Sequence, residues 1–248
     1  MAQLPVRTPH CPTLYLAEQN IVEMSNSTPK RTYLGISAIG DQCSRKLWYS
    51  YHDGLQEKFD AATIMRFEDG HRSEALIAQR LKDTPGIRLI TEDSNGNQIG
   101  VEDFDGRFRG HLDGKIQGLV QDPHKWYVWE AKCTNLTKFS KFKNLKADVG
   151  EHQTLKQWDG TYYAQAQAYM GYTNICQHYL TVCTPGGREW ESVITLFNKS
   201  DFDFIKDKAK RILEAKAPLA RLSNDPSWYQ CKWCNFRDHC HGIEKISA

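Results

Sequence analysis

Apolar residues recur at helical spacing over the first third of the chain and at strand spacing over the middle. Residues 13–24, 37–51 and 61–82 each place apolar side chains along one side of a helix. Ser-Asn-Ser-Thr-Pro at 25–29 separates the first two segments, and Thr-Pro-Gly at 84–86 ends the third. These three segments therefore predict helices.

Between residues 87 and 132 the pattern changes to short β-rich segments. They are separated by turn signals at Asn95-Gly96, Asp105-Gly106, Asp113-Gly114 and Asp122-Pro123, which predict a meander of strands. Further along, the periods predict a helix over 154–172, strands over 175–183 and 189–197, and a helix over 201–222.

Helices, then a meander, then a helix that crosses to further strands predict an α/β protein with a central mixed β-sheet flanked by helices. We divide the chain into a helical N-terminal region (1–60), a core (61–222) and a cysteine-rich C-terminal tail (223–248) packed against the N-terminal region. No internal repeat is present, which argues against a solenoid.

The composition of the chain excludes few classes of function. The 248 residues carry a formal charge of +2, so nucleic-acid binding would depend on local patches of charge. No stretch reaches the roughly 20 apolar residues needed to span a bilayer, and the first residues do not form a signal peptide. We therefore expect a cytoplasmic protein with no membrane association, in which eight cysteines favour metal binding or free thiols over disulfides.

The segment 125–132 contains the first candidate chemistry. In a strand, Glu130 and Lys132 share one face, while Tyr127, Trp129 and Ala131 share the other. Upstream, residues 109–114 end one strand at Asp113 and turn into the next, so a hairpin would bring this carboxylate beside Glu130. Two carboxylates and a backbone carbonyl predict a Mg²⁺ or Mn²⁺ site, where Lys132 would orient water or stabilise developing negative charge.

For an isolated Glu-x-Lys, a solvent-facing pair of side chains beside an ordinary turn explains the same residues. However, Asp113 at a turn followed by Glu130-Ala131-Lys132 on the next strand resembles the signature of the PD-(D/E)XK nuclease superfamily. Within it, the chain is most similar to the RecB, AddB and CRISPR-associated RecB-like exonucleases. The resemblance implies a restriction-endonuclease-like core and a metal-dependent DNA exonuclease acting on single strands or duplex ends.

The resemblance also assigns roles around this signature. His71, which precedes Glu74 by three residues, matches an additional metal ligand, and the backbone carbonyl of Ala131 would complete the set with Asp113 and Glu130. Gln165 and Tyr169 match a Gln-x-x-x-Tyr motif on a helix beside the active site. Without the resemblance, a surface histidine and an amphipathic helix explain these residues equally well.

Three cysteines crowd the tail as Cys231-x2-Cys234-x5-Cys240. Their spacing favours a Zn²⁺ site completed by His239, His241 or the distant Cys43. The resemblance instead implies a structural 4Fe-4S cluster on Cys43 and the three tail cysteines, and we rank this cofactor above zinc. The remaining cysteines, namely Cys11, Cys133, Cys176 and Cys183, are expected to be buried.

Several cationic and aromatic residues are candidates for DNA contacts. They are Lys138 and Lys141 after the active-site strand, Arg45 and Lys46 beside Cys43, and Tyr162 on the Gln165 helix. The resemblance implies partner proteins of recombination or CRISPR adaptation and leaves an oligomer open. The competing hypothesis is a non-catalytic nucleic-acid-binding or scaffold protein with a degenerate nuclease core and a metal-stabilised tail.

Overall fold

A five-stranded mixed sheet organises the chain in the computed structural model, which describes residues 11–243. The strand order is β2-β5-β6-β7-β8, where only β6 and β7 pair in parallel. The bounds are β2 Arg88–Ile90, β5 Gly114–Leu119, β6 Asp122–Cys133, β7 Gln177–Cys183 and β8 Trp190–Leu196. A smaller sheet, ordered β1-β4-β3, combines β1 Leu34–Gly35, β4 Phe108–His111 and β3 Gly100–Asp103. The predicted α/β class with mixed strands is confirmed, with two sheets in place of one.

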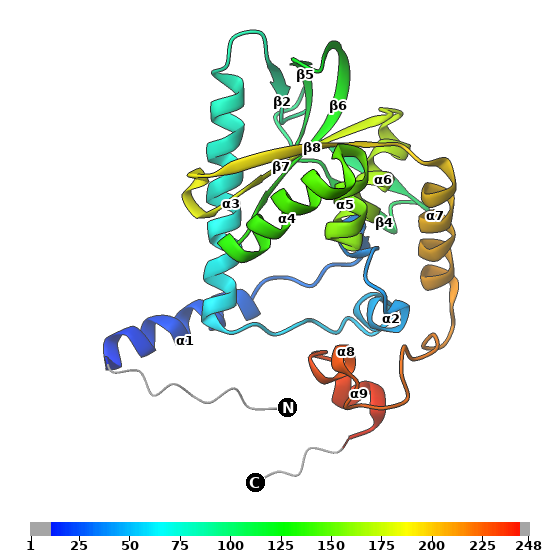
Figure 1. Ribbon diagram of the computed structural model, residues 1–248. Coiled ribbons are helices and arrows are strands. Elements are labelled where there is room, and N and C mark those ends of the chain that lie inside the picture. The colour runs from blue at the N-terminus through cyan, green and yellow to red at the C-terminus, as the bar shows by residue number, and fades with distance from the viewer. Residues whose placement is uncertain (1–10, 244–248) are drawn as a thin grey trace.

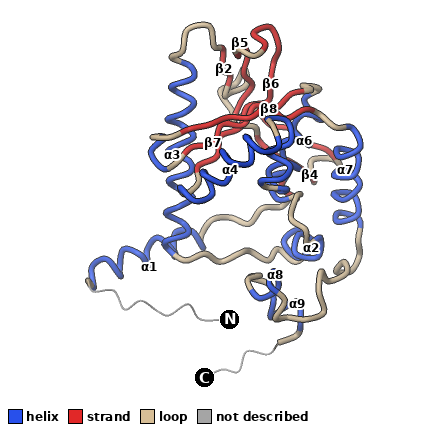
Figure 2. The backbone as a smooth tube through the Cα atoms, viewed as in Figure 1, coloured by secondary structure: helices blue, strands red, loops and turns tan. Residues whose placement is uncertain are grey.

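Helices cover both faces of the larger sheet (Figure 1). The long helix α3 (Ala61–Lys82) packs on one face, and α4 (Leu136–Val149), α5 (Glu151–Trp158) and α6 (Gly160–Thr173) pack on the other. The α7 helix (Lys199–Glu214) contacts α6 and α2 (Ser44–His52). Shorter or peripheral elements are α1 (Pro12–Asn26), α8 (Tyr229–Lys232), α9 (Arg237–His241) and the 3₁₀ turns η1 (Ile36–Ala38) and η2 (Pro185–Gly187). Figure 2 shows the strands gathered among these helices.

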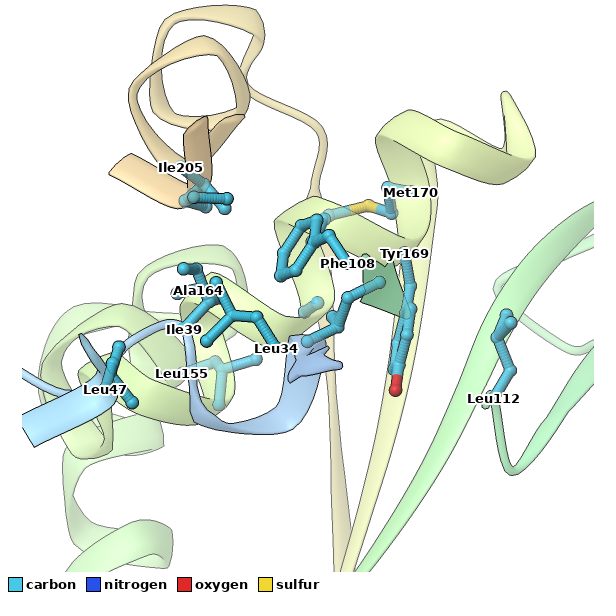
Figure 3. Packing of buried hydrophobic residues seen from close by; sticks show 14 of the residues in the cluster. Leu34, Ile39, Leu47, Phe108, Leu112, Leu155, Ala164, Tyr169, Met170 and Ile205 are labelled. Atoms are coloured by element: carbon cyan, nitrogen blue, oxygen red, sulfur yellow. The ribbon is translucent and has the colours of Figure 1, made fainter. Parts of the chain in front are cut away.

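Strand alternation separates two apolar cores. Tyr127, Trp129 and Ala131 of β6 lie in the core beneath α3, whereas Val128 lies in the larger core on the opposite face. The larger core also takes side chains from α2, α5, α6 and α7, which Figure 3 shows close together around Ile39 and Ala164. Burying a large apolar side chain stabilises a fold by about 1.5–3 kcal/mol, so these cores fix the face to which each β6 side chain points.

Helix boundaries differ from the sequence prediction in three places. The predicted helix over 154–172 is broken at Asp159, whose extended backbone lets its Oδ1 accept hydrogen bonds from the amides of Thr161 and Tyr162, so α6 begins anew. Residues 37–51 form a 3₁₀ turn and then α2, which begins only at Ser44. The last predicted helix ends at Glu214. By contrast, α3 spans 61–82 as predicted, with Asp60 as its N-cap.

Side chains from three helices cover the outer edge of β8. The outward carbonyls of this strand alternate at Ser192, Ile194 and Leu196. They accept hydrogen bonds from Lys146 Nζ at 2.8 Å, His152 Nδ1 at 3.0 Å and Gln167 Nε2 at 2.9 Å, respectively. The outward carbonyls at this edge are therefore bonded although no sixth strand follows among the described residues.

The N-terminal region and the tail lie side by side below the sheets (Figure 1). Arg45 Nη1 donates to the carbonyl of Leu219 at 2.7 Å, and Gln230 Nε2 donates to Gln42 Oε1 at 2.9 Å. Lys208 of α7, only 9% exposed, donates to the carbonyls of Ile39 and Asp41 at 2.7 and 2.5 Å. Within residues 11–243, no helix combines the length and apolar composition that crossing a membrane requires.

Candidate active site

A cleft of about 770 Å³ opens where β5 separates from β6. The β5 strand begins at Gly114 opposite Trp129, so residues 130–132 of β6 continue beyond it. Asp113 stands in this gap, and its Oδ2 accepts a hydrogen bond from the Ala131 amide at 2.9 Å. The hairpin predicted across 109–114 is wrong, because β4 and β5 belong to different sheets. Asp113 nevertheless lies beside Glu130, since the link between the sheets carries it there.

Glu130 is the most enclosed carboxylate of the predicted site, at 3% exposure. Its Oε1 accepts hydrogen bonds from Lys132 Nζ and, at 2.7 Å, from Gln165 Nε2. The shared face of Glu130 and Lys132 is as strand alternation predicts. Glu130 Oε2 is buried and has no hydrogen-bond partner within the described chain. A buried carboxylate oxygen without a partner is unfavourable, so this atom is suited to a cation.

The raised pKa values of the carboxyl groups in the cleft also indicate a site that is suited to a cation. Burial, together with the Asp113 carboxylate, raises the pKa of Glu74 to about 7 and that of Glu130 to about 8. Burial also raises the pKa of Asp113, although Lys132, the Ala131 amide and His71 oppose the shift. Three carboxylates thus surround one ammonium group. Glu74, which the sequence marks only as a neighbour of His71, belongs to this cluster.

Burial alone would lower the pKa of Lys132, but Glu130 and Asp113 hold it above its usual range. The ammonium therefore stays charged at neutral pH and neutralises part of the carboxylate cluster. Its Nζ also lies 5.1 Å from the centre of the Tyr162 ring. Lys132 is in this way held between β6 and α6.

His71 lines the cleft from α3, one helical turn before Glu74. Within residues 11–243, no three His, Cys, Asp or Glu side chains converge as a ready metal-ligand set. In the cleft, the carboxylate oxygens are instead bonded to Lys132, Gln165 and the Ala131 amide. The donor set still fits a hard cation, because it offers several carboxylates, one with an unpartnered oxygen.

Gln165 and Tyr169 project from the same face of α6 into this region, as their spacing predicts. Tyr169 is 1% exposed, and its hydroxyl donates to the His111 carbonyl at 2.8 Å. A Cβ on Gly110 would lie 2.7 Å from that hydroxyl, so the ring packs directly over a glycine. Tyr169 thereby positions the link that carries Asp113. Gly110 was not predicted to belong to the site, although it stands only three residues before Asp113.

No protein-family model matches this chain, and no curated protein matches it at the sequence level. Solved structures do share its fold. An alkaline exonuclease (LHK-Exo) from Laribacter hongkongensis has a TM-score of 0.51 at 15% identity, covering 79% of this chain and 90% of that one. A phage-related exonuclease from Haemophilus somnus 129PT has a TM-score of 0.50 at 14% identity, covering 76% and 94%. At these identities the likeness shows the fold alone.

The predicted DNA-contact residues are dispersed. Lys138 Nζ bonds Asp159 at 2.9 Å and lies above the rings of Trp158 and Tyr162. Lys141 is exposed on α4. Neither Arg45 nor Lys46 lines the cleft. Lys46 pairs with Asp41 at 3.0 Å and Glu57 at 2.9 Å, and Arg45 bonds Tyr49 and the Leu219 carbonyl.

A second cavity, of about 440 Å³, collects all four predicted cluster cysteines. Cys43 reaches it from the start of α2, and Cys231, Cys234 and Cys240 reach it from the tail. Burial raises the pKa of Cys231, and the thiols of Cys43 and Cys240 raise it further. His241 lines the same cavity, whereas His239 packs against Tyr49. The four thiols therefore line one cavity, although within residues 11–243 they do not converge as a ready metal-ligand set.

The remaining cysteines do not all follow the prediction. Cys183 is buried at 1% exposure, and Cys11 and Cys133 are half-buried. Cys176, predicted to be buried, is exposed, because it precedes β7 at the surface. None of these four lines the cysteine cavity formed by Cys43 and the tail.

Proposed function

We propose that this protein is a divalent-metal-dependent DNA nuclease that hydrolyses phosphodiester bonds from the ends of linear or single-stranded DNA. One observation carries the proposal: Glu74, Asp113 and Glu130 surround Lys132 in an open cleft, and Glu130 Oε2 has no hydrogen-bond partner among residues 11–243. The shared fold supports it, since two of the similar structures are of proteins described as exonucleases. A nucleic-acid substrate is also consistent with one of these proteins, because LHK-Exo has been crystallised in complex with dAMP.

His71, Asp113, Glu130 and the backbone carbonyl of Ala131 would hold Mg²⁺ or Mn²⁺. When bound, the cation would supply the Lewis acidity that phosphodiester hydrolysis needs. Lys132 would orient the attacking water or stabilise the charge that develops on the phosphate. Gln165 would fix Glu130 through its hydrogen bond, and Tyr169 would fix the segment that carries Asp113.

DNA digestion tests the proposal. Purified protein is incubated with linear and circular DNA, single- and double-stranded, in Mg²⁺, Mn²⁺ or EDTA. We expect loss of linear substrates only when a divalent cation is present, and loss of that activity in Asp113→Ala. Asp122→Ala is the control, because Asp122 lies at the opposite end of β6 and pairs with Lys125. Binding of DNA without cleavage under every condition would overturn the proposal in favour of a non-catalytic binding protein.

We also propose that Cys43, Cys231, Cys234 and Cys240 hold a 4Fe-4S cluster with a structural role. The four thiols line one cavity although they come from opposite ends of the chain, and thiolates are the ligands of such clusters. The alternative is Zn²⁺. Anaerobic purification is expected to yield a brown protein that contains iron and sulfide and bleaches on oxidation. A colourless protein loaded with zinc would overturn the assignment. Partners in recombination or CRISPR adaptation remain a prediction of the resemblance.

A further inference from the structure

Three arginines line the cleft, namely Arg31, Arg66 and Arg109, and none of them is among the predicted site residues. Arg66 comes from α3, and Arg109 comes from β4 next to Gly110. The inner part of the cleft is acidic, because Glu74, Asp113 and Glu130 gather there. Positive charge therefore lies at the entrance and negative charge at the centre.

The guanidinium of Arg66 is free to bind a ligand. Among residues 11–243 it makes no ion pair within 4.0 Å, although its charge contributes to lowering the pKa of Asp60. Its Nη2 bonds only the nearby hydroxyl of Thr63, at 2.5 Å. Arg109 Nε donates to the Gly106 carbonyl and faces Glu102 loosely, at 3.5 Å, with about half of the side chain exposed. Neither pairing would compete strongly with a phosphate.

Aromatic rings lie next to Arg66 and Arg109. Arg109 lies over the Tyr33 ring at 5.6 Å from its centre. Phe67, the next residue after Arg66, is 48% exposed and touches Phe59 only edge-on, with the ring centres 5.0 Å apart. Tyr33 and Phe67 both line the cleft. An apolar ring exposed at the mouth of a charged cleft is suited to stacking on a base.

Two of the four lysines of α4, by comparison, are paired with carboxylates. Lys138 pairs with Asp159, and Lys146 pairs with Glu191 at 2.9 Å while also bonding the β8 edge. None of the α4 lysines lines the cleft. Besides Lys132, the cations of the described residues that line the cleft thus lie on α3, on β4 and on the segment before β1.

We propose that Arg66, Phe67, Tyr33 and Arg109 form a binding site for single-stranded DNA at the mouth of the cleft. The arginines bind backbone phosphates on either side of the bond that enters the carboxylate cluster. The rings stack on bases, whose faces are accessible only where the strand is unpaired. This proposal rests on the proposed nuclease function, because that function is the reason for expecting the strand to run from the arginines into the carboxylate cluster.

Salt-dependent binding tests the site. A fluorescent oligo(dT) and a duplex of matched length are titrated with full-length protein in EDTA over a range of salt concentrations. For the single strand, Arg66→Ala and Arg109→Ala are each expected to reduce the slope of log K against log salt by about 0.7, and the double variant by about 1.4. Phe67→Ala is expected to weaken binding roughly 5- to 100-fold at an unchanged slope. Binding to the duplex should be weaker and insensitive to Phe67.

The control is Arg72→Ala, which removes the same charge from the same helix. Arg72 pairs with Glu68 and Asp69 and does not line the cleft, so the slope should stay at the wild-type value. Arg66→Lys should restore the slope, and Phe67→Trp should restore the affinity. Arg66 is exposed, so its variants test the site even if Arg109→Ala fails to fold.

Two outcomes overturn the binding site. One is a wild-type slope in both arginine variants while Lys141→Ala lowers it, and the other is duplex binding as tight as single-strand binding with no effect of Phe67→Ala. Failure of the nuclease proposal is distinguishable. If digestion depends on metal but the arginine variants bind DNA normally, only the binding-site proposal is overturned. If binding depends on the arginines but no digestion occurs, only the nuclease proposal is overturned.

Discussion

The acidic cleft and the cysteine cavity are assembled in different ways. In the cleft, Glu130 and Lys132 share a strand face, and Gln165 and Tyr169 bond the carboxylate and the backbone around them. The cavity instead joins chain segments as far apart as Gln42 and Gln230, 188 residues in sequence. The cleft is therefore positioned by secondary structure, whereas the cavity depends on contacts between chain ends that a metal would complete.

The comparison predicts first that single side chains in the cleft control activity without controlling the fold. Lys132→Met should lower cleavage of linear DNA by about 100- to 1,000-fold, because it removes the charge that stabilises the reacting phosphate. Lys125→Met is the matched control, since Lys125 lies on the same strand and pairs with Asp122 at the exposed end. Steady-state digestion and the melting temperature are measured together. Equal loss in both variants would contradict the assignment.

A second, smaller effect separates two glutamines on α6. Gln165→Ala should reduce activity about 10- to 100-fold, because it releases Glu130 from its hydrogen bond. Gln167 instead bonds the Leu196 carbonyl and the Asn198 amide. Gln167→Ala should therefore lower the free energy of unfolding by about 1–3 kcal/mol and leave the rate nearly unchanged. If the two substitutions exchanged these effects, Gln165 would be a packing residue only.

A third prediction concerns pH and metal removal. The folded, metal-free protein retains protons on Glu74 and Glu130, whose pKa values are raised to about 7 and about 8, while the unfolded chain has already released them. Stability in EDTA should thus fall as pH rises from about 6.5 to 8.5. Buried His178, with a pKa lowered to about 3, acts only at lower pH, where the unfolded chain would protonate it.

Melting curves in EDTA at these two pH values test this. Glu130→Gln should flatten the decrease, and Mg²⁺ or Mn²⁺ should raise the melting temperature more at the higher pH, because the cation competes with protons for the carboxylates. An equal decrease in wild type and variant, with no effect of cation, would mean that the cluster does not bind metal.

The smallest effect on catalysis is expected from the cysteine cavity. Cys43→Ser should abolish bound iron or zinc and make the tail more sensitive to protease, yet leave cleavage nearly unchanged. Cys176→Ser is the control, because Cys176 is exposed and distant from the cavity lining. Metal analysis, limited proteolysis and digestion are compared. If Cys43→Ser lost cleavage while the tail stayed resistant to protease, the cysteine cavity and the cleft would not be independent sites.

Local signals predicted much of this structure. The bounds of α3 follow from the Asp60 N-cap and the Pro85-Gly86 stop, and the alternation over 125–132 separates Glu130 from Trp129. The break at Asp159 was readable in principle, because Asp is a preferred N-cap residue. The partition of β4 and β5 into two sheets was not, since strand periodicity does not specify which strands pair.

Placement of charged side chains was the harder part of the site. Lys46 and Lys138 were predicted to contact DNA, but both have carboxylate partners brought to them by tertiary structure. Whether a lysine is paired depends on residues distant in sequence, which spacing does not reveal. Glu74 acquires its raised pKa for the same reason, because burial and Asp113 come together only in the folded chain.

The covered edge of β8 also bears on how molecules of this protein meet at high concentration. An open strand edge is a template onto which a second chain can add its own strand, and it is a common starting point for aggregation. Here the carbonyls of Ser192, Ile194 and Leu196 are already occupied by side chains of the same molecule. A strand of a second molecule would find these carbonyls occupied, which disfavours growth of the sheet from one molecule into the next.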